Sequence, residues 1–498
     1  MTAVVKVTQG SLQGEIKEDH TVFRGIPFAA PPTGSRRFQP PADPEPWTGV
    51  RSALKNGPTC PQIKTAMPGM AGSGPNKEDC LYLNVFTPAV DQKRRPVMFW
   101  IHGGGFVLGS GSETMYDGSR LAVRGDVVVV TINYRLGALG YADFGADGEA
   151  FGAGPNNGQL DQVKALEWTR DHIAAFGGDP DNVTIFGESA GAMAVDCLLA
   201  MPVAKGLFHK AIMQSGAGFR TKDPEQLQGL SLRLKAACEE EGKTLQEIPV
   251  EDIVTAQTKV LKPEETMTGF GPVTDGTILP GQPLASLGAG NAAGIPVMLG
   301  TNRDEMKLFN NMPGRKPVTD EQLLGLVRQT LNCDEPAATE TIAAYKAARE
   351  EKGLPVNLND LYDGFMSLTV FRLPSARAAA ARDGQAGGTW HYMFTYESPA
   401  FGGHFAACHA LEIPFVFGNL NDTFANLFAG KGPDVEKLSG QMMDAWLAFA
   451  RTGDPSHAGI GTWQQYSSAD RATMVFDKTC RMENDPYGAE RLLVESRL

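Results

Sequence analysis

The stretch GESAG, Gly187 to Gly191, decides the fold, because the segments on both sides give its G-x-S-x-G pattern a mechanical meaning. Residues 182–186 (NVTIF) are typical of a short buried strand, and residues 190–195 (AGAMAV) of a helix that begins with small side chains. A serine on a tight strand-to-helix turn is exposed, and the helix N-terminus directs N–H groups at developing negative charge. The pattern predicts a nucleophile elbow at Ser189; the alternative is a glycine-rich loop without chemistry.

A second glycine run complements this serine. Residues 96–101 (PVMFWI) form an apolar run of strand type that leads into HGGG, His102 to Gly105. Successive glycines let the backbone approach a substrate oxygen, and their N–H groups form an oxyanion hole together with the residue after the nucleophile. The predicted donors are Gly104, Gly105 and Ala190. Taken alone, the run also fits a flexible turn.

The acid and the base are expected further along the chain, in that order. Residues 295–301 (IPVMLGT) predict a buried strand that leads to Asp304 and Glu305, so a carboxylate lies at the sheet edge where the sites of open α/β sheets form. Residues 391–396 (HYMFTY) predict a late strand, and His409 lies in the loop after it. The chain has eight histidines, so position alone does not select the base. The residues also leave the choice between Asp304 and Glu305 open.

Strand and helix patterns alternate from about residue 81 to 215, which predicts an α/β protein with a mostly parallel sheet. Helical patterns dominate residues 221–257 and 319–382, and we expect these insertions to form a lid-like layer over the sheet. No linker-like run divides the 498 residues, so we expect one domain over residues 1–498. Four apolar side chains at helical spacing fit either a substrate gorge or plain core: Phe365, Met366, Leu368 and Phe371.

Composition excludes several functions. The 57 acidic and 45 basic residues give a net charge of −12, so nucleic acid and anionic membranes are not expected partners. No apolar run approaches the ~20 residues that span a bilayer, and the N-terminus lacks a signal-peptide pattern. Seven cysteines cannot all pair, which favours a reducing, cytoplasmic location. No clustered histidine and cysteine spacing predicts a metal site, and we expect no cofactor.

Several segments together resemble the type-B carboxylesterases. They are GESAG after 179–186 (DPDNVTIF), 23–29 (FRGIPFA), 78–85 (EDCLYLNV), 128–135 (VVVTINYR) and 409–418 (HALEIPFVFG). The resemblance covers nearly the whole chain, and its character is that of the bacterial p-nitrobenzyl-esterase-like branch. It implies an α/β-hydrolase fold and a serine carboxylesterase that works through an acyl-enzyme without a cofactor.

The resemblance also assigns roles by position. Ser189 matches the nucleophile, His409 the base, and Glu305 the acid, because the family uses glutamate there and this decides against Asp304. The residue after Glu305 is Met306, where many relatives have glycine, so we expect a stiffer backbone at this point.

Two further residues are expected to support these three. Ser215 matches a serine that hydrogen-bonds near the triad, although it also fits a simple turn cap. Glu188, beside the nucleophile, is expected either to stabilise a charged His409 or to make only structural hydrogen bonds.

The segment from Cys60 to Cys80 bears on the substrate. Secreted relatives close a disulfide at these positions, and cholinesterases carry there a tryptophan that holds the choline cation. In this chain the segment has no aromatic residue, and it offers Pro61, Met67, Pro68, Met70 and Pro75. We therefore expect short to medium acyl esters of neutral alcohols and phenols. The alternative substrates are amides, carbamates or polyesters. A non-catalytic adhesion protein is the least expected function. We expect a monomer that acts on a small-molecule ester.

Overall fold

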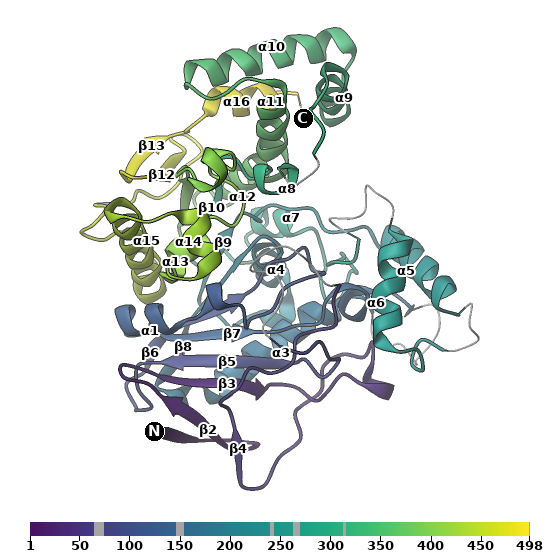
Figure 1. Ribbon diagram of the computed structural model, residues 1–498, viewed down its shortest axis with the longest axis vertical. Helices are drawn as coiled ribbons and strands as arrows, with labels where there is room; N and C mark the ends of the chain where they lie inside the picture. The colour runs from purple at the N-terminus through teal and green to yellow at the C-terminus, as the bar shows by residue number, and fades with distance from the viewer. Residues whose placement is uncertain (64–73, 146–153, 240–243, 262–268, 312–314, 498) are drawn as a thin grey trace.

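The computed structural model describes residues 1–63, 74–145, 154–239, 244–261, 269–311 and 315–497. Within these residues thirteen strands form one sheet in the order β1-β2-β3-β5-β7-β6-β8-β9-β10-β11-β12-β13, with β4 beside β2. Neighbours from β7 to β12 in this order are parallel. The outer pairs, from β1 to β7 and between β12 and β13, are antiparallel. This confirms the predicted α/β architecture with a mostly parallel central sheet (Figure 1).

The bounds of the elements are as follows. The strands are β1 (Thr2–Val7), β2 (Gly10–Ile16), β3 (Thr21–Pro27), β4 (Val50–Ser52), β5 (Tyr82–Thr87), β6 (Arg95–Ile101), β7 (Val128–Ile132), β8 (Gly178–Glu188), β9 (Lys210–Gln214), β10 (Val297–Asn302), β11 (Thr389–Phe394), β12 (Ala472–Phe476) and β13 (Arg481–Asn484). The helices are α1 (Ser119–Gly125), α2 (Gly137–Tyr141), α3 (Asn157–His172), α4 (Ala190–Ala200), α5 (Pro224–Glu239), α6 (Val250–Val260), α7 (Pro283–Gly288), α8 (Lys307–Asn310), α9 (Asp320–Leu331), α10 (Glu335–Glu351), α11 (Leu358–Ser367), α12 (Leu373–Ala381), α13 (Ile413–Phe417), α14 (Thr423–Ala429), α15 (Pro433–Thr452) and α16 (Gly488–Glu495).

The central strands are buried on both faces, which explains why they read as continuous apolar runs. Every residue of β6 is buried. Its side chains alternate between two cores: Val97, Phe99 and Ile101 belong to one, and Met98 and Trp100 to the other. Because helices cover both faces, the sheet needs no polar side.

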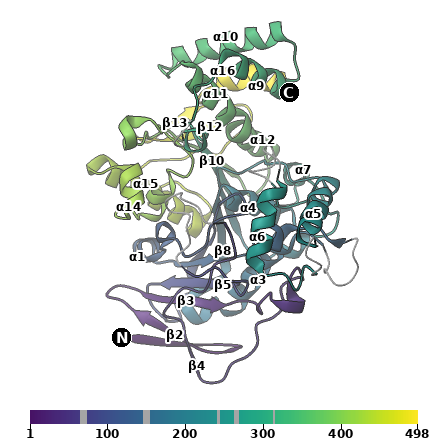
Figure 2. The same ribbon diagram turned by 45° about the vertical axis from the view of Figure 1, so that its right-hand side comes forward.

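Helices occupy both blocks that the sequence predicts as insertions. The first block contains α5 and most of α6, and the second contains α9, α10, α11 and α12. Helices α9 to α11 pack with the C-terminal α16 at one end of the molecule, opposite the N-terminal strands (Figures 1 and 2). These helices have a core of their own, which includes Tyr345, Phe365, Leu368 and Val494. A lid-like position over the sheet edge stays a prediction.

The parallel strands β6, β8, β10 and β11 end at one edge of the sheet. Ile101 pairs with Gly187, Glu188 with Gln214, and Gln214 with Gly300. The glycine run, Ser189 and the segment that contains Glu305 therefore follow neighbouring strand ends, which is where sites of such sheets form. Among the described helices, none is long and apolar enough to cross a membrane.

Candidate active site

The strand–turn–helix that the sequence predicts around Ser189 is present. Ser189 joins β8 to α4 with φ 55° and ψ −124°, a conformation that costs energy for any residue with a side chain. Its N–H donates to the Gln214 carbonyl at 2.8 Å. A Cβ on Gly191 would lie 2.0 Å from the Ile101 carbonyl oxygen, so only glycine lets the turn pack against β6. The turn holds Ser189 partly exposed at the sheet edge.

The glycine run lies directly against this turn. A Cβ on Gly103 would lie 2.8 Å from a carboxylate oxygen of Glu188 and 3.2 Å from the Ser189 Cβ. Within the described residues, the N–H groups of Gly104, Gly105 and Ala190 donate no hydrogen bond to the protein. Three donors beside the Ser189 turn are thus free to bind an oxygen of a ligand.

His409 lies between two buried carboxylates. Its Nδ1 is 2.6 Å from Glu305 Oε2, and its Nε2 is 3.0 Å from Glu188 Oε1. The second Glu305 oxygen accepts the backbone N–H of Asn302 at 2.8 Å. All three side chains of this group are at most 2% exposed. Both imidazole nitrogens therefore face a carboxylate.

These contacts shift the pKa of His409. Burial alone would lower its pKa, but the charges of Glu188 and Glu305 outweigh burial and raise the pKa of His409 above its ordinary range. For the carboxyl group of Glu188 burial acts in the opposite direction and raises the pKa. Burial lowers the pKa of His102 and of His391 to about 4, so these two histidines are neutral near pH 7. Among these three histidines, His409 is thus the one whose pKa neighbouring carboxylates raise.

The structure separates Asp304 from Glu305. Asp304 Oδ2 accepts Arg303 Nε at 2.8 Å and the Ala407 N–H at 3.3 Å, and it has no contact with His409 in the described structure. Arg303 also pairs with the exposed Glu397. His404 is exposed, and its backbone carbonyl accepts a hydrogen bond from Asn311 Nδ2 at 3.2 Å. The structure therefore brings Glu305, and neither Asp304 nor His404, to the site.

Four residues that support the site have no role predicted from the sequence. Gln214 Nε2 donates to Glu412 Oε1 at 3.1 Å, and Asn302 Nδ2 donates to Glu412 Oε2 at 2.7 Å. Trp446 Nε1 donates in turn to Gln214 Oε1 at 3.0 Å. The sequence offers only spacing from which their role could be predicted: Asn302 precedes Glu305 by three residues, and Glu412 follows His409 by three. This buried network joins the end of β10, which leads to Glu305, to the segment that carries His409.

The remaining predicted residues have mixed outcomes. Ser215 lies next to the site with its N–H on the Gly300 carbonyl, but its hydroxyl has no hydrogen-bond partner among the described residues, so its supporting role stays a prediction. Cys60 and Cys80 are buried free thiols. Met67, Pro68 and Met70 lie outside the described residues.

Aromatic side chains surround the imidazole. The rings of Phe309 and Phe371 each have their centroid 5.0 Å from that of His409. Of the four apolar residues with two interpretations, Phe371 therefore reaches the site, whereas Phe365 and Leu368 belong to the core of the helical block. Among the described residues, no group of three or more histidine, cysteine, aspartate or glutamate side chains is placed to hold a metal ion.

Comparison with known proteins agrees with this geometry. The model of the carboxylesterase family matches residues 1–491. The chain belongs to this family. It is 39% identical to the para-nitrobenzyl esterase of Bacillus subtilis, over 99% of this chain and 98% of that protein. The predicted membership of the family, the α/β-hydrolase fold and carboxylic ester hydrolase activity are thereby confirmed.

Solved structures agree as well. The carboxylesterase EST55 of Geobacillus stearothermophilus is similar with a TM-score of 0.87 and 40% identity, covering 98% of this chain and 99% of that one. An esterase of Clostridium hathewayi that can hydrolyse aliphatic aromatic polyesters is similar with a TM-score of 0.79 and 33% identity, covering 100% and 98% of the two chains.

Substitution of the two neighbouring acids tests the assignment. Glu305→Gln is expected to lower kcat about 10³-fold or more, because an amide cannot accept from both Asn302 and the His409 Nδ1–H in the productive tautomer. Asp304→Asn removes the buried charge partner of Arg303, so it should lower thermal stability and keep most of the activity per folded molecule. Steady-state kinetics and thermal melts of both variants decide this, and equal losses of kcat would show that the acid is wrongly assigned.

Proposed function

We propose that the protein hydrolyses carboxylic esters through an acyl-enzyme on Ser189. His409 is the general base, Glu305 orients it, and the N–H groups of Gly104, Gly105 and Ala190 bind the oxyanion. The observation that carries this proposal is the 2.6 Å contact between His409 Nδ1 and Glu305, at the same sheet edge as the strained Ser189 turn. These residue types in this arrangement perform acyl transfer.

Acylation begins when Ser189 Oγ attacks the ester carbonyl carbon and the hydroxyl proton moves to His409 Nε2. The carbonyl oxygen becomes an oxyanion that the three free N–H groups stabilise, and each such donor contributes up to about 10²–10³ in rate. The imidazolium then gives its proton to the leaving alkoxide, so the alcohol departs and the acyl group stays on Ser189. Water repeats the attack with the same proton transfers and releases the acid.

Glu188 takes part in these reaction steps through its contact with His409. Its Oε1 lies 3.0 Å from the His409 nitrogen that must accept the serine proton. A proton shared between Glu188 and His409 Nε2 has to leave the imidazole before His409 can act as a base. Once Ser189 has given up its proton, the same carboxylate stabilises the imidazolium that forms. Glu188 therefore lowers the energy of the charged intermediate and makes the active form dependent on pH.

The substrate class follows from the surroundings of the site. Phe309 and Phe371 present apolar ring surface next to His409. No cation platform is expected in the segment between Cys60 and Cys80, because its sequence has no aromatic residue. We propose short to medium acyl esters of neutral alcohols and phenols as substrates. Polyesters are the second candidate, favoured by the similarity to the Clostridium hathewayi esterase.

The nucleophile is tested by Ser189→Ala. Because triad members act as a unit, the variant should fold and lose at least ~10³-fold in kcat for p-nitrophenyl butyrate. An organophosphate should label the wild-type protein stoichiometrically at Ser189 and leave the variant unlabelled, as read by mass spectrometry of peptides. Near-normal turnover by purified Ser189→Ala would contradict the proposed mechanism.

A substrate panel tests the class. Values of kcat/KM are compared for phenyl butyrate, butyrylthiocholine, butyranilide and a soluble aromatic oligoester. The cationic ester should gain nothing, since a cation–π platform is worth roughly 0.5–2 kcal/mol and none is expected here. A clear preference for butyrylthiocholine would overturn the interpretation of the segment, and a preference for the oligoester would favour the second candidate.

A further inference from the structure

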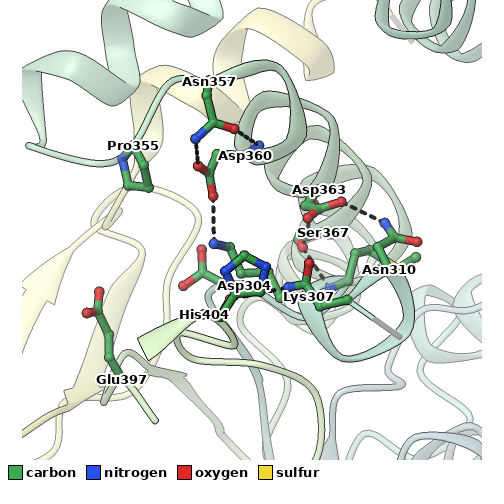
Figure 3. A network of polar contacts seen from close by, with 12 residues as sticks. Asp304, Lys307, Asn310, Pro355, Asn357, Asp360, Asp363, Ser367, Glu397 and His404 are labelled. Carbon is green, nitrogen blue, oxygen red and sulfur yellow. Dashed lines mark hydrogen bonds and ion pairs between the residues drawn. The ribbon is translucent and has the colours of Figure 1, made fainter. Parts of the chain in front are cut away.

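A polar strap follows the catalytic acid directly. It comprises residues 306–311, and three of these residues hydrogen-bond or pair with helix α11. Figure 3 shows that Lys307 and Asn310 of the strap point toward Asp360 and Asp363 of the helix. Neither the fold nor the proposed reaction accounts for these charges, and apolar side chains would suffice for simple packing.

Lys307 and Asn310 of the strap, and Arg315 beyond it, meet one stripe of the helix. Lys307 Nζ lies 2.6 Å from Asp360 Oδ1, and Asn310 Nδ2 donates to Asp363 Oδ1 at 2.7 Å. Arg315 donates with both of its Nη groups to the carboxylate of Asp363, at 2.7 Å each. Residues three and four apart share one face of a helix, so Asp360 and Asp363 form a continuous acidic stripe.

Ser367 continues this stripe by one turn and contacts the backbone beside the acid. Its Oγ accepts the Met306 N–H at 3.0 Å and donates to the Asp363 carbonyl at 2.7 Å. The peptide immediately after Glu305 is thus hydrogen-bonded to α11. Met306, Asp363 and Ser367 are all at most 3% exposed, so no water competes for these bonds.

Burial restricts the geometry of the ion pairs between the strap and α11. Lys307 and Asp360 are both 9% exposed, and ions at this depth lose much of their hydration. Such a pair adds little net stability over apolar packing of the same volume. Its geometry is nevertheless strict, because removing one partner leaves a buried charge unpaired. The pairs therefore fix the register of the strap on the helix more than they stabilise the fold.

The two elements that this register joins both touch His409. Phe309 lies on α8 between Lys307 and Asn310, and Phe371 lies in the π-helical turn (Leu368–Arg372) that follows Ser367. Their ring centroids are each 5.0 Å from the imidazole. The strap thus carries the acid and one ring, and the helix carries the other ring.

We propose that the Lys307–Asp360 ion pair, with Asp363 and Ser367, is a positioning device that holds Glu305, Phe309 and Phe371 in register around His409. The proposal rests on the function proposed above, in which His409 is the base. Lys307 and Asp360 are positioning residues, since neither touches the reacting atoms. A shift of the strap by a fraction of a helical turn displaces the acid and the ring together, and misplacement by about 1 Å costs up to about 10²-fold in rate.

The test compares variants of the full chain with p-nitrophenyl butyrate, after titrating active sites with an organophosphate. Lys307→Met should lower kcat about 10- to 100-fold per titrated site while KM changes by less than about threefold. Lys307→Arg, which keeps the charge, should restore most of kcat. The matched control is Lys346→Met, because Lys346 is an exposed lysine of the same helical block, 4.0 Å from Glu350. The control should behave like the wild type.

If Lys307→Met does not fold, the double variant Lys307→Met/Asp360→Leu decides, because it replaces the ion pair by an apolar pair without leaving a buried charge. It should melt near the wild-type temperature and still show the loss in kcat. A stable single or double variant with wild-type kcat would overturn the proposal. That result would leave the proposed function intact, since Ser189→Ala tests the function separately.

Discussion

The interaction on which the site depends is the pairing of one imidazole with two buried carboxylates. A carboxylate removed from water is costly unless a charge and hydrogen bonds compensate it. Glu305 accepts the His409 Nδ1–H and the Asn302 N–H, and Glu188 is an ion-pair partner of the same imidazole, with its Oε1 3.0 Å from His409 Nε2. Because both compensations meet on His409, a displacement of this ring would leave two buried carboxylates unpaired. The surrounding network through Glu412 restrains that displacement by hydrogen bonds.

The sequence predicts those parts of the site that local constraints determine. The Ser189 turn requires glycine where a side chain would strike β6, so it leaves a pattern in neighbouring residues. The choice between Asp304 and Glu305 leaves no such pattern, because the two differ only in their distant partners. Asp304 pairs with Arg303 and holds Ala407, whereas Glu305 reaches His409, 104 residues away. Family resemblance makes this choice where residue patterns do not.

Helical periodicity predicts where the insertions lie, but not which side chains reach the site. Phe365 and Phe371 fit one apolar pattern in the sequence, yet Phe365 packs against Tyr345 in the helical core and Phe371 packs against His409. A π-helical turn over Leu368–Arg372 begins after Phe365 and contains Phe371, so the two side chains do not follow one regular helical repeat. Periodicity of 3.6 residues assumes a regular helix, so it cannot report this change. The cytoplasmic location, the single domain and the monomeric state stay predictions.

The most direct test of the account is the pH dependence of kcat/KM for a neutral ester, in the wild type and in Glu188→Gln. Catalysis needs the neutral imidazole, so activity falls as pH decreases through the pKa of His409. Because the two carboxylates raise this pKa, the acid limb of the wild type should lie above the ordinary histidine value of ~6.5. Removing the charge of Glu188 should move the limb to lower pH. An acid limb that stays in place, or moves to higher pH, would contradict the view that Glu188 holds the proton on His409.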